Sequence, residues 1–328
     1  MMMSSSRIPA LKKRPKMPSW GEVLERIEES QKRVGVEAYD VVRNHYLDKL
    51  QEYTGRDTIL YSTAWTVSQA SSANQSIDNT DIHGFMEALS GLDDDELDLI
   101  LHSQGGQPEA AEQIVEYLRA KYDEIRVFVP HSARSAATLI CCAADEIHMG
   151  AHSSLGPVDP QMSMQTPLGP RLVPAQSILD QFDEARDDFQ DDKETGHWVP
   201  LIRQYGPSLL KECEDAIDYS GELVERWASE YMFSGDDADE RAEKLARILS
   251  ERQEHKSHSR PIMRSEAEDI GFNIKPIEDD DELQDRVLSV FHAAYHTHAG
   301  TSAIKIIQNS QNNAFVVMSQ QSEETDDS

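Results

Sequence analysis

The fold is decided by residues 97–149, which read LDLILHSQGGQPEAAEQIVEYLRAKYDEIRVFVPHSARSAATLICCAADEIHM. Three short segments rich in apolar residues, Leu97–His102, Ile125–Pro130 and Asp145–Met149, predict strands. Apolar residues at helical spacing follow the first of them, and the run Ser135–Ala144 follows the second. Strands that are joined through helices pair in parallel with right-handed crossovers, so the stretch predicts an α/β fold.

The same alternation begins earlier, with a predicted strand at Thr58–Thr63 and a predicted helix at Asp81–Leu92. Residues 19–53 carry apolar residues at helical spacing, and Gly35 is expected to divide them into two helices. The second half is predicted to be largely helical, and its apolar stripes are expected to pack in the core or at a subunit interface. The predicted fold class is an α/β core of repeated strand–helix units with a largely helical second half.

These patterns divide the chain into six predicted segments. Residues 1–18 are expected to form a flexible basic arm, and residues 319–328 a disordered acidic tail. Between them we predict an N-terminal helical segment, an α/β core that carries the candidate site, a helical region with the remaining core, and a C-terminal hairpin. Their bounds are 19–53, 54–165, 166–300 and 301–318.

The composition excludes several classes of protein. A formal net charge of −29 predicts a surface that repels nucleic acid and anionic membranes. We interpret the excess carboxylates as solubilising, with adaptation to high salt as the alternative. No apolar run approaches 18 residues and the N-terminus lacks the apolar core of a secretory signal, so a cytoplasmic protein without a membrane partner is expected. Cys141 and Cys142 are expected to be buried packing residues rather than a redox pair.

Two features of residues 97–149 carry chemistry. Gly105 and Gly106 follow a strand, where backbone N–H groups can point outward and hold a developing oxyanion. Ser135 stands at the start of a helix, where unpaired N–H groups and positive potential stabilise an alkoxide. A tight turn and a plain N-cap, by Ser135 or Ser132, are the simpler interpretations of each feature alone. Together they predict a nucleophile beside its oxyanion donors.

The motifs around these residues resemble the serine dehydrogenase proteinase family of the Clp protease/crotonase superfamily, which is related to signal peptide peptidase A. The closest resemblance covers HSQGG at 102–106, AAEQI at 110–114, ARSAATLI at 133–140, ADEI at 144–147 and LGPVDPQ at 155–161. A looser resemblance covers HSRPI at 258–262 and AEDIG at 267–271. The sequence departs from the family pattern at Gln104, where Pro is usual, and at Ala137, where Gly is usual.

The resemblance implies a Clp protease/crotonase-like core and a serine peptidase that acts on unfolded protein or peptides. It implies Ser135 as nucleophile, Asp159 as the acid and His258 as the base, in the family's chain order. It further implies oxyanion donors at Gly105, Gly106 and Ala136, and a homo-oligomer. Rival residues for the acid and the base are Asp145, His148, His152 and His197.

Other classes stay open at this point. A Ser/Lys dyad would use Lys193 or Lys256 as base. A crotonase-type enzyme would use the same oxyanion donors on an acyl-CoA thioester, and a scaffold would use none of this chemistry. His292 and His296 have metal-ligand spacing, but no carboxylate completes an H-E-x-x-H motif, so no metal is expected. No P-loop and no G-x-G-x-x-G motif is present, and no cofactor is expected.

Overall fold

A computed structural model describes residues 20–67, 72–166, 169–189, 195–250 and 260–319. The predicted basic arm, and all of the predicted acidic tail except Ser319, lie outside these residues. The centre of the molecule is a seven-stranded sheet in the order β10-β5-β3-β2-β1-β11-β12. Its strands are β1 Asp57–Thr63, β2 Glu96–His102, β3 Glu124–Val129, β5 Glu146–Met149, β10 Ile274–Pro276, β11 Ala303–Asn309 and β12 Ala314–Met318.

The first five strands of that order are parallel, whereas β11 pairs antiparallel with β1 and β12 pairs antiparallel with β11. The predicted parallel α/β core is therefore confirmed, and β11 and β12 form the predicted hairpin at the sheet edge. β5 begins at Glu146, one residue after the predicted start at Asp145, whose carboxylate accepts from the backbone N–H of Ile125 and from Arg119. Asp145, a rival for the catalytic acid, thus has a structural role in the sheet.

Alternate residues of each central strand face opposite layers of helices. In β2, Leu99 and Leu101 belong to the large core on one face, whereas Ile100 belongs to a separate core on the other. In β3, Val127 and Phe128 divide in the same way. Both faces are buried, which explains the nearly continuous apolar runs of these strands.

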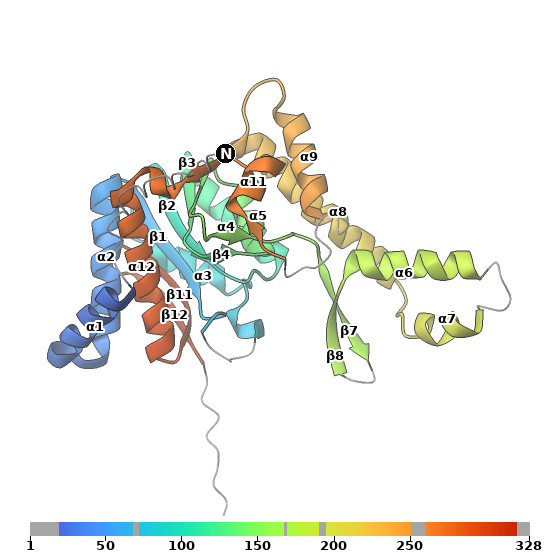
Figure 1. Ribbon diagram of the computed structural model, residues 1–328, viewed down its shortest axis with the longest axis horizontal. Coiled ribbons are helices and arrows are strands. Elements are labelled where there is room, and N and C mark those ends of the chain that lie inside the picture. The colour runs from blue at the N-terminus through green and yellow to red at the C-terminus, as the bar shows by residue number, and fades with distance from the viewer. Residues whose placement is uncertain (1–19, 68–71, 167–168, 190–194, 251–259, 320–328) are drawn as a thin grey trace, which may run out of the picture.

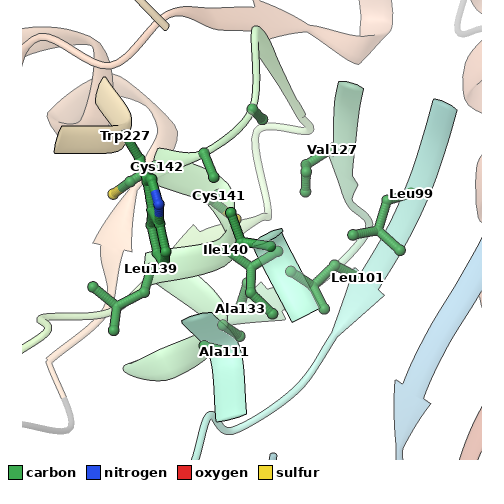
Figure 2. Packing of buried hydrophobic residues seen from close by; sticks show 14 of the residues in the cluster. Leu99, Leu101, Ala111, Val127, Ala133, Leu139, Ile140, Cys141, Cys142 and Trp227 are labelled. Atoms are coloured by element: carbon green, nitrogen blue, oxygen red, sulfur yellow. The ribbon is translucent and has the colours of Figure 1, made fainter. Parts of the chain in front are cut away.

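One layer of helices contains α1 and α2, which are separated at Gly35 as predicted, and α12 (Figure 1). The other layer contains α3, α4, α5, α8 and α9, and Figure 2 shows Trp227 of α8 packed against α5. Cys141 and Cys142 are buried free cysteines in this core, as predicted. The bounds are α1 Trp20–Val34, α2 Ala38–Thr54, α12 Asp281–Gly300, α3 Asp81–Ala88, α4 Pro108–Arg119, α5 Ala136–Cys142, α8 Leu209–Trp227 and α9 Ala238–Ser250.

A hairpin and two helices project away from the sheet (Figure 1). They are β7 Gln161–Thr166, β8 Gly169–Pro174, α6 Ala175–Asp188 and α7 Thr195–Ile202. A small apolar cluster that includes Ile178 and Cys213 joins α6 to α8. The sequence analysis missed the hairpin, because its strands are only half-buried and carry few β-branched residues.

The remaining elements are short. A three-stranded sheet in the order β4-β6-β9 lies beside the carboxyl ends of the central strands, and α11 follows β9. Single helical turns connect the other elements. The bounds are β4 Ser132–Ala133, β6 Ser154–Leu155, β9 Ile262–Met263, α11 Arg264–Ile270, η1 Gly35–Glu37, η2 Ser72–Gln75, η3 Ala228–Met232 and η4 Ile277–Asp279.

Candidate functional site

The turn after β2 is held in one conformation by backbone hydrogen bonds. Gly105 has a φ of +93°, a conformation that glycine adopts at little cost. Its carbonyl oxygen accepts from the N–H of Ile77 at 2.8 Å, and the N–H of Gln107 donates to the carbonyl of Ile77 at 2.9 Å. The N–H of Gly105 donates to Ser103 Oγ at 3.1 Å. The backbone of Ile77 is therefore bonded to the chain on both sides of Gly106, at Gly105 and at Gln107.

Ser135 is the residue immediately before α5, at the end of the strand–turn that follows β3. Its φ of +50° and ψ of −121° lie in a region that non-glycine residues rarely occupy. The surrounding structure enforces this turn. Thr138 Oγ1 donates to the carbonyls of Ala133 and Gly156, and α5 is buried along its whole length. A strained serine at the amino end of a buried helix is a candidate nucleophile.

The glycine turn and the serine turn touch each other. A Cβ atom added to Gly105 would overlap the carbonyl oxygen of Arg134 and would lie 2.7 Å from Ser135 Cβ and 2.9 Å from the backbone nitrogen of Ala136. Real Cβ atoms do not approach other atoms so closely, so only glycine fits at position 105. The sequence-predicted residues Gly105, Ser135 and Ala136 are thus brought together.

A cavity of about 630 Å³ opens over these two turns. Gly105, Gly106, Ser135 and Ala136 all line it. Its other walls come from elements that are distant in the sequence, including the projecting hairpin and α8. Those lining residues are Trp65, Ser76, Gln104, Pro108, Glu109, Arg134, Leu139, Val158, Pro160, Gln161, Met162, Leu172, Ala216 and Ser220.

Two backbone N–H groups border this cavity. The described residues contain no cis peptide bond, so the N–H of Gly106 points opposite to the Gly105 carbonyl, which faces Ile77. Ala136 is the first residue of α5, where backbone N–H groups have no acceptor within the helix. Neither N–H donates to a backbone carbonyl of a described residue. Both are suited to an anionic ligand, since the amino end of a helix also adds positive potential.

Asp159 is buried between Val158 and Pro160, which both line the cavity. The N–H of Val158 donates to the carbonyl of Leu249, the next-to-last residue of α9, at 3.3 Å. His258 lies outside the described residues, in the gap that follows α9. The chain resumes at Arg260, and β9 pairs with β6 through Leu155. Both described flanks of that gap therefore lie beside the segment that leads to Asp159.

The rival histidines within the described chain do not line the cavity. His148 lies on β5, where its Nε2 is 3.2 Å from Glu146 Oε2 and its ring packs on Phe128. The Nε2 of His152 is 2.9 Å from the carbonyl of Pro130. His197 is exposed on α7. The rival bases Lys193 and Lys256 lie outside the described residues.

The sequence analysis missed several lining residues. Arg134 and Trp65 line the cavity side by side, with the guanidinium carbon of Arg134 5.2 Å from the indole centroid, and Arg134 Nε donates to Ser132 Oγ at 3.2 Å. Met162 and Leu172 come from the hairpin. Arg134 could have been noticed from its place beside Ser135, whereas no local pattern marks a hairpin that folds over a distant turn.

A buried aromatic stack lies beside the site. His102, at the end of β2, stacks between Trp65 and His131 at centroid distances of 5.7 and 5.3 Å. Burial, and after it the positive charges of His131, His298 and Arg134, lower the pKa of His102 to about 3. The ring is therefore neutral at ordinary pH, and it packs the carboxyl end of β2 rather than holding a charge there.

This burial predicts a loss of stability in acid. The pKa of His102 is lower in the folded chain, about 3, than in the unfolded chain, about 6.5. Its contribution is therefore complete above about pH 6.5 and is lost as the pH falls toward 3. Between pH 7 and pH 5 the wild type should lose about 2 kcal/mol more unfolding free energy than His102→Phe. Urea unfolding at both pH values measures this, and replacement of the exposed His197 by Phe is the control. Equal losses in wild type and His102→Phe would contradict the prediction.

Metal and membrane signals are absent where the chain is described. None of its clusters brings together three or more His, Cys, Asp or Glu residues in a way that could hold a metal ion. None of the helices in the same residues is both long and apolar enough to cross a bilayer.

The sequence is similar to a known protein family and to two curated proteins. A family model described as ClpP-like SDH-type serine proteinase matches residues 77–284. Two uncharacterized proteins of Methanocaldococcus jannaschii are 31% and 28% identical over 181 and 178 residues. Those matches cover 55% and 54% of this chain, and 54% and 51% of the relatives. The chain thus spans about half the length of the curated relatives it matches.

Solved structures with a similar chain course include a mutant of the 1510-N membrane-bound stomatin-specific protease, at 15% identity and a TM-score of 0.35. That match covers 61% of this chain and 74% of the other. A ClpP1 mutant from Listeria monocytogenes is 16% identical with a TM-score of 0.32, and the match covers 71% of this chain and 98% of the other.

Proposed function

Since this chain belongs to the family of ClpP-like SDH-type serine proteinases, we propose that it hydrolyses peptide bonds through an acyl-enzyme on Ser135. The observation that carries the proposal is the contact between the Gly105–Gly106 turn and Ser135–Ala136 within one cavity. Acyl transfer needs a nucleophile that can reach the carbonyl carbon of the substrate and hydrogen-bond donors that can reach its carbonyl oxygen. The two turns offer both.

In the proposed reaction, Ser135 Oγ attacks the carbonyl carbon of the substrate. The N–H groups of Gly106 and Ala136 hold the oxyanion that forms, at a benefit of about 3–4 kcal/mol for each donor. The N–H of Gly105, which the sequence analysis expected among the donors, donates to Ser103 Oγ instead, so Gly105 is proposed to act by allowing the two turns to approach each other closely. The carbonyl then reforms, the amine leaves with a proton from the general acid, and water releases the acyl group from Ser135.

His258 is proposed as the base that takes the Ser135 proton and returns it to the leaving amine. Asp159 is proposed as the residue that orients the imidazole. The family resemblance supports both assignments. The course of the chain adds support, because the described flanks of the His258 segment lie beside Leu155 and Val158, close in sequence to Asp159.

An extended peptide is the proposed substrate. The cavity wall offers apolar side chains from several elements, Leu139, Val158, Met162 and Leu172 among them, against which apolar residues of an unfolded segment can pack. Arg134 and Glu109 add opposite charges at the same cavity. A homo-oligomer is proposed from the family resemblance alone.

A fluorophosphonate probe tests the nucleophile directly. We expect one adduct per folded chain, on Ser135 by peptide mass mapping, because the oxyanion donors activate the same atom toward phosphorus as toward carbon. Hydrolysis of an unfolded protein such as reduced casein should fall in proportion to labelling. Urea-unfolded chain, which keeps every serine but not the site, is the control. An adduct on another residue, no adduct at all, or full hydrolysis after complete labelling would each contradict the proposal.

A further inference from the structure

The position of the Gly105–Gly106 turn depends on residues 76–78, which belong neither to that turn nor to the turn at Ser135. Ile77 exchanges hydrogen bonds with Gly105 and Gln107, as described above. A Cβ atom on Gly106 would overlap the backbone of Ile77, so the two chains lie in direct contact. Ser76 lines the cavity, and its Oγ accepts from Gln104 Nε2 at 3.2 Å. Any displacement of residues 76–78 would therefore displace the Gly105–Gly106 peptide.

A buried lysine holds this segment from the opposite side. Lys305 lies on β11 and is 1% exposed. Its Nζ donates to the backbone carbonyl of Ser76 at 2.8 Å, and it pairs with Asp78 at 3.1 Å and Asp81 at 2.5 Å. Asp81 is fully buried and also accepts from Tyr61 Oη at 2.7 Å. The ammonium group thus joins the central sheet to the segment that brackets the glycine turn.

A lysine side chain is suited to the contacts that Lys305 makes. An ammonium group has three N–H donors, and the three acceptors around Lys305 account for all of them. A buried charge is costly unless it is paired, and two carboxylates pair this one. An apolar residue of similar length would fill the same space, but it could not bind the Ser76 carbonyl. The lysine therefore fixes a backbone position as well as filling the core.

We propose that Lys305 is a positioning residue for catalysis, which fixes residues 76–78 and through Ile77 holds the Gly106 N–H where the oxyanion forms. The inference rests on the proposed function of the Gly105–Gly106 turn. Lys305 itself touches neither substrate nor Ser135 in this role. Its effect belongs to the transition state, because the oxyanion exists only there.

Replacement of Lys305 by methionine should lower kcat for peptide hydrolysis by about 10- to 100-fold, because a small misplacement of a donor has effects of that size. KM should stay within about twofold. The substrate affinity of Ser135→Ala, measured without turnover, should be equal with and without Lys305→Met. A merely structural lysine would lower the fraction of folded enzyme and leave kcat per folded site unchanged.

Arg43 offers a matched control. Like Lys305 it is a buried cation, 1% exposed, and it contacts β11 through Gln308, but its other partners are Thr297 and Asp40 on α12 and α2. Arg43→Met should lose stability and keep its kcat. Equal reductions of kcat in Arg43→Met and Lys305→Met would overturn the inference, as would an unchanged kcat in Lys305→Met.

Two further variants keep the test decisive. Lys305→Arg retains a cation with several donors and should recover at least half of the lost kcat. If Lys305→Met does not fold, Asp78→Asn replaces it, since the Asp78 side chain is 28% exposed and its loss loosens the same segment. An unchanged kcat in Asp78→Asn would then refute the inference. Activity that survives in Ser135→Ala would refute the proposed function instead, so the two failures are distinguishable.

Discussion

Replacement of Ser135 by alanine should reduce kcat/KM for peptide hydrolysis by at least about 1000-fold, the scale on which serine peptidases lose activity with their nucleophile. The acyl-enzyme cannot form without Oγ, and the remaining N–H donors only polarise the substrate carbonyl. Initial rates on an unfolded protein substrate measure the loss. Ser132→Ala is the informative comparison, because Ser132 was the alternative helix-capping serine and its Oγ forms hydrogen bonds with Ser154 Oγ and Arg134 Nε.

The strained backbone of Ser135 gives the same experiment a second readout. At a φ of +50° glycine is relaxed and alanine is not, so Ser135→Gly should be more stable than Ser135→Ala by about 1 kcal/mol in urea unfolding. Both variants should be inactive. A Ser132→Ala variant as inactive as Ser135→Ala, or a Ser135→Gly variant that retains wild-type rates, would show that the nucleophile has been assigned wrongly.

Gly105→Ala should reduce kcat/KM by at least about 100-fold, as much as the removal of an oxyanion donor costs. The added methyl group would overlap the carbonyl oxygen of Arg134, which belongs to the backbone and cannot turn aside. The two turns must then separate, and Ser135 moves away from the Gly106 N–H. Initial-rate kinetics and fluorophosphonate labelling should decline together.

Gly271 provides the control for Gly105. Its φ of +113° is also left-handed, but a Cβ atom there would meet nothing within 4 Å. Gly271→Ala should therefore share the backbone strain, about 1 kcal/mol, without the loss of activity. Similar rates in Gly105→Ala and wild type would mean that the contact between the turns is irrelevant to the chemistry.

The parts of the molecule that were predictable are those with a local signal. The strands around Leu99 and Val127 could be predicted from their apolar runs, because helices cover both faces of the sheet. Gly105 and Ser135 were recognisable because a left-handed turn and a helix start favour particular residues at particular places. Cys141 and Cys142 lay in an apolar helix, and burial followed from that.

What escaped prediction depends on contacts between distant segments. Nothing near Lys305 in the sequence relates it to Gly105, and a lysine in a strand ordinarily signals exposure rather than burial. Met162 and Leu172 belong to a half-buried hairpin whose place over the cavity is set by α8. The proposed pairing of Asp159 with His258 is likewise a relation between segments that are distant in the sequence.

The two proposed oxyanion donors, the N–H groups of Gly106 and Ala136, belong to the backbone, and this affects which substitutions the chain can accept. A donor supplied by the main chain constrains side-chain identity only where space or backbone conformation demands it, as at Gly105. Gln104 illustrates the freedom that follows. Where the family pattern favours the rigid ring of proline, this chain has a flexible side chain whose amide binds Ser76. In this chain a hydrogen bond between two side chains takes the place of the covalent restraint of a proline ring, so the proposed backbone donors leave the side chain at position 104 free to vary.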